Sequence, residues 1–104
     1  MPGSSEQKGE KMKSILQDEK KCFVTGSERG LHRHHIFGGY NRDESERYGL
    51  WIWLRWDRHI ADSPHRTPHN DIEVDLMYKR IAQRKFEDVY GHEEFMRIFG
   101  KNYL

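Results

Sequence analysis

The sequence predicts a small α+β domain with two short strands, a short helix and longer helices near the C-terminus. The chain has 104 residues, of which 35% are hydrophobic and 12% aromatic, enough for one small domain with a core. Two short apolar runs lie next to glycines, an arrangement that is typical of short strands. After residue 71, apolar side chains recur at helical spacing among charged ones.

Residues 1–11 are rich in Gly, Ser, Glu, Gln and Lys and offer little to bury. We interpret them as a flexible leader or an expression remnant, with Met12 as an alternative start. Residues 12–104 are then expected to form a single domain. Its strands and short helix would occupy about residues 30–70, and its C-terminal helices about residues 71–99.

The elements follow in order along the chain. We predict a strand over residues 31–37, closed by Gly38 and Gly39, and a polar loop over residues 40–48. The aromatic run at residues 49–54 predicts a second strand. A short helix is expected over residues 57–61, followed by a loop that holds two prolines.

Two helices are predicted in the C-terminal part. The periodic segment at residues 71–90 has Asn70 as a candidate N-cap and Gly91 as a stop. A last helix is expected over residues 93–99, ending at Gly100. The longer helix is interpreted as scaffold for the strands or for a partner.

Composition excludes several classes of protein. The formal net charge is +1, so no global basic field indicates a nucleic-acid partner. The single cysteine, Cys22, excludes an intramolecular disulfide and fits a reducing compartment. The longest apolar run, near Trp51, is too short to cross a membrane. These observations predict a cytoplasmic protein without a membrane partner.

The histidines carry the chemical signal. Six of the seven lie between positions 32 and 69, with His34 and His35 side by side and His59 24 positions after His35. Neutral imidazole is a common ligand of transition metals. An adjacent imidazole can accept the proton of a water that attacks a phosphodiester. The pattern predicts metal-assisted chemistry.

At these residues the chain resembles the HNH endonuclease family, and from residue 21 to 104 it is similar to small phage-encoded HNH proteins. The motifs that carry the resemblance are 34–39 (HHIFGG), 41–42 (NR), 48–50 (YGL), 82–86 (AQRKF) and 99–104 (FGKNYL). The resemblance implies a ββα-metal (HNH-like) finger with additional C-terminal helices. It also implies a phage or prophage origin and a bacterial host cytoplasm.

The resemblance further implies a metal-dependent DNA endonuclease or nickase. His35 would be the general base, His34 and His59 would be metal ligands, and His69 would be a third ligand, with His65 competing for that role. One divalent metal ion is expected: histidine ligands favour Zn, Ni, Co or Mn, while Mg remains possible through bound water. DNA is the expected partner.

The chain departs from the family pattern in three places. Many relatives carry a structural zinc on two Cys-x-x-Cys or Cys-x-x-His pairs. The corresponding positions here are Cys22, Thr25, Arg55 and Arg58, so no structural zinc is expected. Trp51, Trp53 and Trp56 are expected to form core in its place. The family's middle asparagine has no clear counterpart, and Ser63 stands four residues after His59, where a ligand would be expected.

Several residues have two interpretations. Arg33, Arg42 and Arg58 are candidate nucleic-acid contacts, since guanidinium groups bind phosphates, but nearby carboxylates could pair with the arginines instead. His32 alternates with His34 along a strand and so shares its face, where it could contact phosphate or only solvent. His92 is interpreted as a capping or surface residue, and Cys22 as a small buried one.

Two other functions compete with the nuclease. One is a catalytically inactive HNH-derived binding module, for example a phage-encoded inhibitor of a host defence system. Because fold does not fix function, the three departures favour this alternative. The other is a purely structural metal site that stabilises a small domain. A protein partner or a homodimer fits each of these functions.

Overall fold

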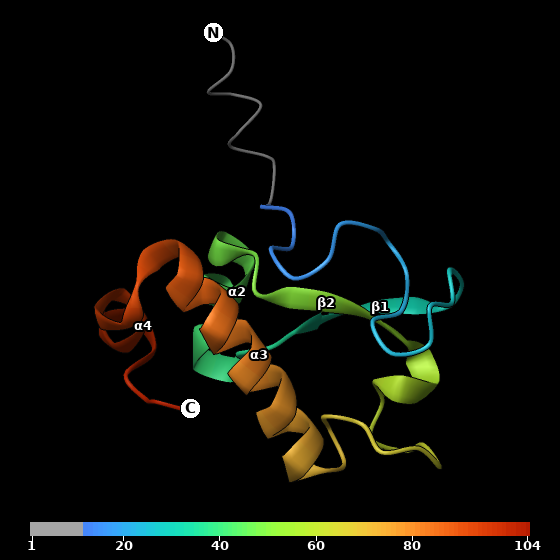
Figure 1. Cartoon of the computed structure of the whole chain (residues 1–104). Helices are drawn as coiled ribbons and strands as arrows, with labels where there is room; N and C mark the ends of the chain where they lie inside the picture. The colour runs from blue at the N-terminus through green and yellow to red at the C-terminus, as the bar shows by residue number, and fades with distance from the viewer. Residues whose placement is uncertain (1–11) are drawn as a thin grey trace, which may run out of the picture.

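A computed structural model describes residues 12–104. The leader predicted at residues 1–11 lies outside the described residues, and Met12, the alternative start, is the first of them. The described chain is an α+β domain of two antiparallel strands and three α-helices, compatible with a ββα arrangement (Figure 1). Its elements are β1 (Leu31–His35), η1 (Gly39–Asn41), α2 (Arg42–Tyr48), β2 (Trp51–Arg55), η2 (Trp56–Arg58), α3 (Ile72–Tyr90) and α4 (His92–Phe99), where η marks a 3-10 turn.

The two-stranded sheet sorts its side chains onto two faces. β1 and β2 pair so that His34 lies opposite Ile52 and His35 opposite Trp51. Since successive strand residues point to opposite faces, His34 and Ile52 share the buried face. His35 and Trp51 share the other. Adjacent histidines thus leave β1 in opposite directions.

The outer edge of β2 is covered by the preceding segment of chain (Figure 1). The Ser14 hydroxyl donates to the carbonyl of Trp51 at 2.6 Å, and the Gln17 side-chain oxygen accepts from the Trp53 amide at 2.7 Å. The Phe23 amide donates to the carbonyl of Trp53 at 2.8 Å. Side chains and backbone together therefore take the place of a third strand.

The prediction of a loop over residues 40–48 is wrong, because most of this segment forms α2. Acidic residues in its first turn and Arg47 in its last suit the helix dipole, and Gly49 ends it at a left-handed φ of 70°. A seven-residue helix is marginal alone, so tertiary contacts must fix it. Buried Ser45 does so: its hydroxyl accepts from the Phe37 amide at 3.0 Å and donates to the Phe37 carbonyl at 2.7 Å.

The short helix expected over residues 57–61 is also corrected. Only the 3-10 turn η2 forms, and His59 lies at its C-terminal end rather than at the start of a helix. The chain leaves the turn because Ser63 donates to the Asp57 carbonyl at 2.5 Å and Thr67 donates to the Ile60 carbonyl at 3.0 Å. The Asp57 carbonyl is the one that would accept from the Ala61 amide in a longer helix, and Pro64 has no amide hydrogen to donate to the Ile60 carbonyl.

The two C-terminal helices are confirmed with shifted starts. α3 is capped by Asp71, whose side chain accepts from the Glu73 amide at 2.9 Å, and not by Asn70. Asn70 instead organises the preceding loop, accepting from the Thr67 amide at 2.8 Å. Gly91 ends α3 as predicted, at a φ of 95°.

The core lies between the sheet and the two C-terminal helices, with α4 folded beside the C-terminal half of α3 (Figure 1). Its largest members include Phe37, Phe86 and Phe95, each contributing roughly 1.5–3 kcal/mol by burial. Among the tryptophans, Trp51 is buried and Trp53 half-buried, whereas Trp56 is 45% exposed, which the core prediction missed.

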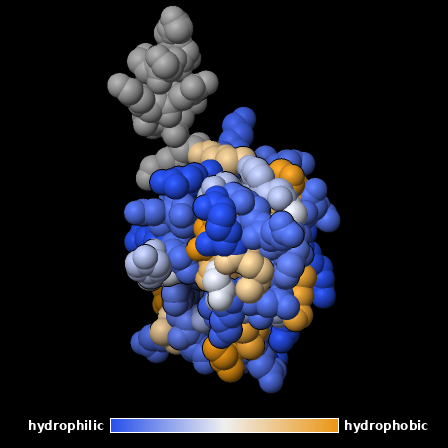
Figure 2. Space-filling model, turned by 90° about the vertical axis from the view of Figure 1, so that its left-hand side faces the viewer, coloured by the Kyte–Doolittle hydropathy of each residue, from blue (hydrophilic) through white to orange (hydrophobic). Residues whose placement is uncertain are grey.

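One buried amide fastens the C-terminal tail to α3. The Gln83 side chain donates to Glu87 at 2.8 Å and to Asn102 at 2.7 Å, and it accepts from the Tyr103 amide at 2.8 Å. The surface shown in Figure 2 is mainly hydrophilic, with small separate hydrophobic patches. Within residues 12–104, no helix has the length and apolarity needed to cross a bilayer.

Candidate metal centre and adjacent cleft

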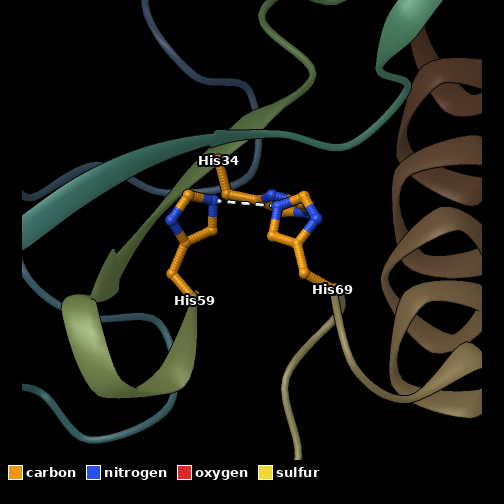
Figure 3. A group of neighbouring side chains, drawn as sticks. All are labelled: His34, His59 and His69. Atoms are coloured by element: carbon orange, nitrogen blue, oxygen red, sulfur yellow. Dashed lines mark hydrogen bonds between the residues drawn. The ribbon is translucent and has the colours of Figure 1, made fainter. Parts of the chain in front are cut away.

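Three histidines from separate parts of the chain converge on one point (Figure 3). His34 lies on β1, His59 ends η2, and His69 lies in the loop before α3. One ring nitrogen of each lies within 4.8 Å of the others, and the Nε2 atoms of His59 and His69 are 3.2 Å apart. The three residues could therefore bind one metal ion.

A buried nitrogen supports this interpretation. His34 is only 4% exposed, and its Nε2 atom has no hydrogen-bond partner within residues 12–104. An unpaired buried polar atom is costly, so its presence indicates a ligand that the nitrogen is placed to bind. The chemistry of the donor set agrees, because three imidazoles suit Zn, Co or Ni.

The surroundings of His34 and His59 keep these two rings neutral. Burial, followed by the charges of neighbouring histidines, lowers the pKa of His34 to about 3. Burial, with His69 and His32 nearby, lowers the pKa of His59 to about 4. Neutral rings retain the lone pair that a metal needs, so both residues are ready to bind a cation at neutral pH.

The loop that carries His69 is fixed by hydrogen bonds. Buried Thr67 accepts from the His69 amide at 3.2 Å, and Asn70 donates to the carbonyls of Ala61 at 3.2 Å and His65 at 3.0 Å. The loop therefore presents His69 to the cluster. His65, the competing candidate, lies instead 3.7 Å from Asp57.

The cluster opens into a cleft of about 280 Å³ that also reaches His35. Its lining residues are Arg33, His34, His35, Gly38, Gly39, Arg42, His59 and His69. The cleft thus joins the three candidate ligands to the candidate base.

A carboxylate holds His35 in place. Glu46, on α2, accepts a hydrogen bond from His35 Nε2, and Arg33 donates to both Glu46 carboxylate oxygens at 3.1 Å. Although burial opposes it, the hydrogen bonds and charges of His35 and Arg33 lower the pKa of Glu46. An ionised carboxylate beside an imidazole orients the ring and favours a proton on the shared nitrogen.

The three candidate nucleic-acid contacts differ in their surroundings. The Arg33 guanidinium pairs with Glu46 and lies 3.8 Å from the centre of the Trp51 ring. Arg42 is exposed at the cleft, and no ion pair involving it is found in residues 12–104. Arg58 is half-buried on η2 and is not among the side chains that line the cleft.

The remaining candidates lie outside the cleft. His92 pairs with Glu87 at 2.6 Å, Arg55 pairs with Asp57 at 3.3 Å, and Cys22 is buried in the core. For these residues the structure agrees with the plainer interpretation. In the part of the chain that the structure describes, the histidine trio is the one group of three or more His, Cys, Asp or Glu side chains placed to hold a metal ion.

Sequence reasoning missed two contacts of the site. Glu46 lies in a segment predicted to be loop, and nothing in its spacing indicates that it reaches His35. His32 was expected to share a face with His34, and its Nδ1 atom lies 3.0 Å from Nδ1 of His59. The alternation along β1 was a usable signal for that contact.

No protein-family profile, curated protein or solved structure matches this chain.

Proposed function

We propose that this protein is a metal-dependent endonuclease or nickase of the HNH type that hydrolyses DNA phosphodiesters. The observation that carries the proposal is the juxtaposition of the histidine trio with His35 in one cleft, His35 being held by Glu46. A metal centre beside an oriented imidazole is what hydrolysis of a phosphodiester needs. The HNH resemblance supplies DNA as the substrate.

His35 acts as the general base. Because its Nε2–H donates to Glu46, its Nδ1 atom carries the lone pair. Nδ1 takes a proton from water as the water oxygen attacks phosphorus. The bond from phosphorus to the leaving sugar oxygen breaks, and that oxygen takes a proton from solvent. Glu46 stabilises the imidazolium that forms, and Arg33 holds Glu46 in place.

The other residues bind the cation and the substrate. His34, His59 and His69 would hold a divalent ion, which when bound neutralises charge on the phosphate and the leaving oxygen. Arg42 is exposed in the cleft and can bind a neighbouring phosphate. The exposed glycines Gly38 and Gly39 allow the sugar-phosphate backbone to approach closely.

The arrangement also bears on two departures from the family pattern. The chain lacks a counterpart of the family's asparagine, and Glu46 is the side chain between the strands that contacts His35. Ser63 replaces the ligand expected four residues after His59, and His69 lies beside His59 instead. Both changes keep a ligand trio and a held base, which favours an active enzyme over a binding module.

The proposal is tested by nicking of supercoiled plasmid with Mg, Mn, Co, Ni or Zn supplied in turn. His35→Ala is expected to slow nicking by about 10²–10⁴-fold, the usual contribution of a general base. Glu46→Gln is expected to slow it by at least about 10-fold, mainly in kcat, because the ring loses its charged partner. The matched control is His92→Ala: His92 pairs with Glu87 and does not line the cleft, so its loss should leave nicking unchanged.

A direct metal titration accompanies the assay. His35→Ala should bind Co²⁺ like the parent protein, since His35 is not a proposed ligand. The parent protein could fold and bind Co²⁺ in the titration and yet cut no DNA with any of the five metals. In that case the nuclease proposal is wrong and the binding module takes its place. Equal rates for His35→Ala and the parent would remove His35 from its role.

A further inference from the structure

A fourth histidine, His32, contacts the histidine trio at the ring of His59. Nδ1 of His32 is 3.0 Å from Nδ1 of His59, and the two rings meet edge-on, with centres 5.2 Å apart. Nε2 of His59 lies 3.2 Å from Nε2 of His69 on the other side of the ring. His59 is therefore contacted at both nitrogens, by a cluster histidine at one and by His32 at the other.

The two nitrogens of His59 must do different things when a cation is present. A ring that binds a metal through Nε2 keeps its proton on Nδ1, and this N–H needs an acceptor. His32 Nδ1 is placed to accept it, with the proton of His32 on its own Nε2 atom. The contact then stabilises this tautomer of His59 and fixes the angle of its ring.

We infer that His32 is a positioning residue of the metal centre, accepting a hydrogen bond from His59 and so strengthening the binding of a divalent cation. This inference rests on the metal centre of the proposed function and not on DNA cleavage. His32 is not a further ligand of the same ion, because it contacts the nitrogen of His59 opposite to the one that lies near His69.

Without a cation, the histidines can share protons in either direction. If His32 donates to His59 Nδ1, then His59 Nε2 carries the proton and points it toward His69. In that tautomer the lone pair is on Nδ1, and Nε2, the nitrogen near His69, has none for a metal. Binding of a cation selects the opposite arrangement, and His32 must be able to accept for that arrangement to be stable.

The test compares the metal affinities of two variants at position 32 whose new side chains are nearly equal in size. In His32→Asn the side-chain oxygen occupies nearly the position of Nδ1 and still accepts, whereas His32→Leu removes the acceptor. Co²⁺ affinity is measured by visible absorption with a competing chelator. We expect His32→Leu to weaken binding by about 10–100-fold and His32→Asn to stay near the parent value.

Two further measurements make the result decisive. His65→Leu replaces a histidine that lies outside the cluster and is expected to bind Co²⁺ like the parent. In the zinc-loaded parent, histidine nitrogen NMR should place the proton of His59 on Nδ1 and show slow exchange. The His32→Leu protein, checked for folding by circular dichroism, should retain the tautomer but exchange this proton faster.

The outcomes separate the inference from the proposal beneath it. Equal affinity in His32→Leu and the parent would overturn the positioning role while leaving the metal centre intact. An equal loss in His32→Leu and His32→Asn would make His32 a direct ligand and also overturn the inference. Failure of the parent to bind cobalt would overturn the metal centre and the inference together, whatever the plasmid assay shows.

Discussion

Acidification should destabilise the metal-free protein through His34. Its side chain is 4% exposed, and its pKa falls from an ordinary 6.5 to about 3 on folding. A folded-state pKa below the unfolded value means that the unfolded chain takes up the proton first. The contribution to stability is therefore complete above pH 6.5 and is lost as the pH falls toward 3.

The size of the effect follows from these two values. A pH of about 5 is about 1.5 units below the pKa of His34 in the unfolded state, 6.5. There the unfolded state binds nearly one proton more at this site than the folded state does. Each unit is worth about 1.4 kcal/mol, so the free energy of unfolding should fall by about 2 kcal/mol between about pH 8 and about pH 5. The pKa of His59 shifts in the same direction and adds to the loss.

The assay is urea unfolding followed by tryptophan fluorescence, with chelator present, for the parent and for His34→Leu. The variant has an apolar side chain at the buried position, so the difference in stability between the two proteins isolates His34. That difference should change by about 2 kcal/mol over this pH range. Parallel loss of stability in both proteins would show that His34 is not held neutral and would refute the reasoning.

Three other predictions concern stability. Ser45→Ala should cost about 1–3 kcal/mol, because it leaves both polar backbone groups of Phe37 unpaired in the core, and urea unfolding would measure it. Gln83→Leu should cost a similar amount and loosen the tail, seen as faster amide exchange at Tyr103. Saturating Co²⁺ or Zn²⁺ at about 100 times its Kd should stabilise the parent by about 2.7 kcal/mol in the same unfolding assay, and His69→Ala should abolish most of this gain.

The features that could be predicted from the sequence are those that depend on the spacing of histidines or on the periodicity of apolar residues. The adjacent histidines and the separation to His59 predicted a cluster that the structure brings together, with His69 chosen over His65. The apolar spacing of α3 predicted that helix almost to its ends, because its buried face sets the pattern. The two strands were predicted with bounds that differ by one or two residues.

The predictions that were wrong or missing concern segments whose conformation depends on tertiary contacts. The segment that forms α2 is polar and carries no apolar stripe, so tertiary contacts such as the docking of Ser45 against Phe37 decide that it is helical. The contact between Glu46 and His35 depends on that helix and was invisible for the same reason. His59 ends a turn where Ser63 and Thr67 bind the carbonyls of Asp57 and Ile60, contacts that helix propensity does not reveal.

The covered edge of β2 has a consequence for how copies of the protein can meet. An unpaired strand edge is a template for another chain, and long apolar edges promote aggregation. Here the Trp51 carbonyl and both Trp53 backbone groups are already occupied by Ser14, Gln17 and Phe23. The segment at residues 14–23 therefore blocks this edge from pairing with a strand of another molecule. Its detachment, rather than global unfolding, is the event expected to open a route to strand-mediated association.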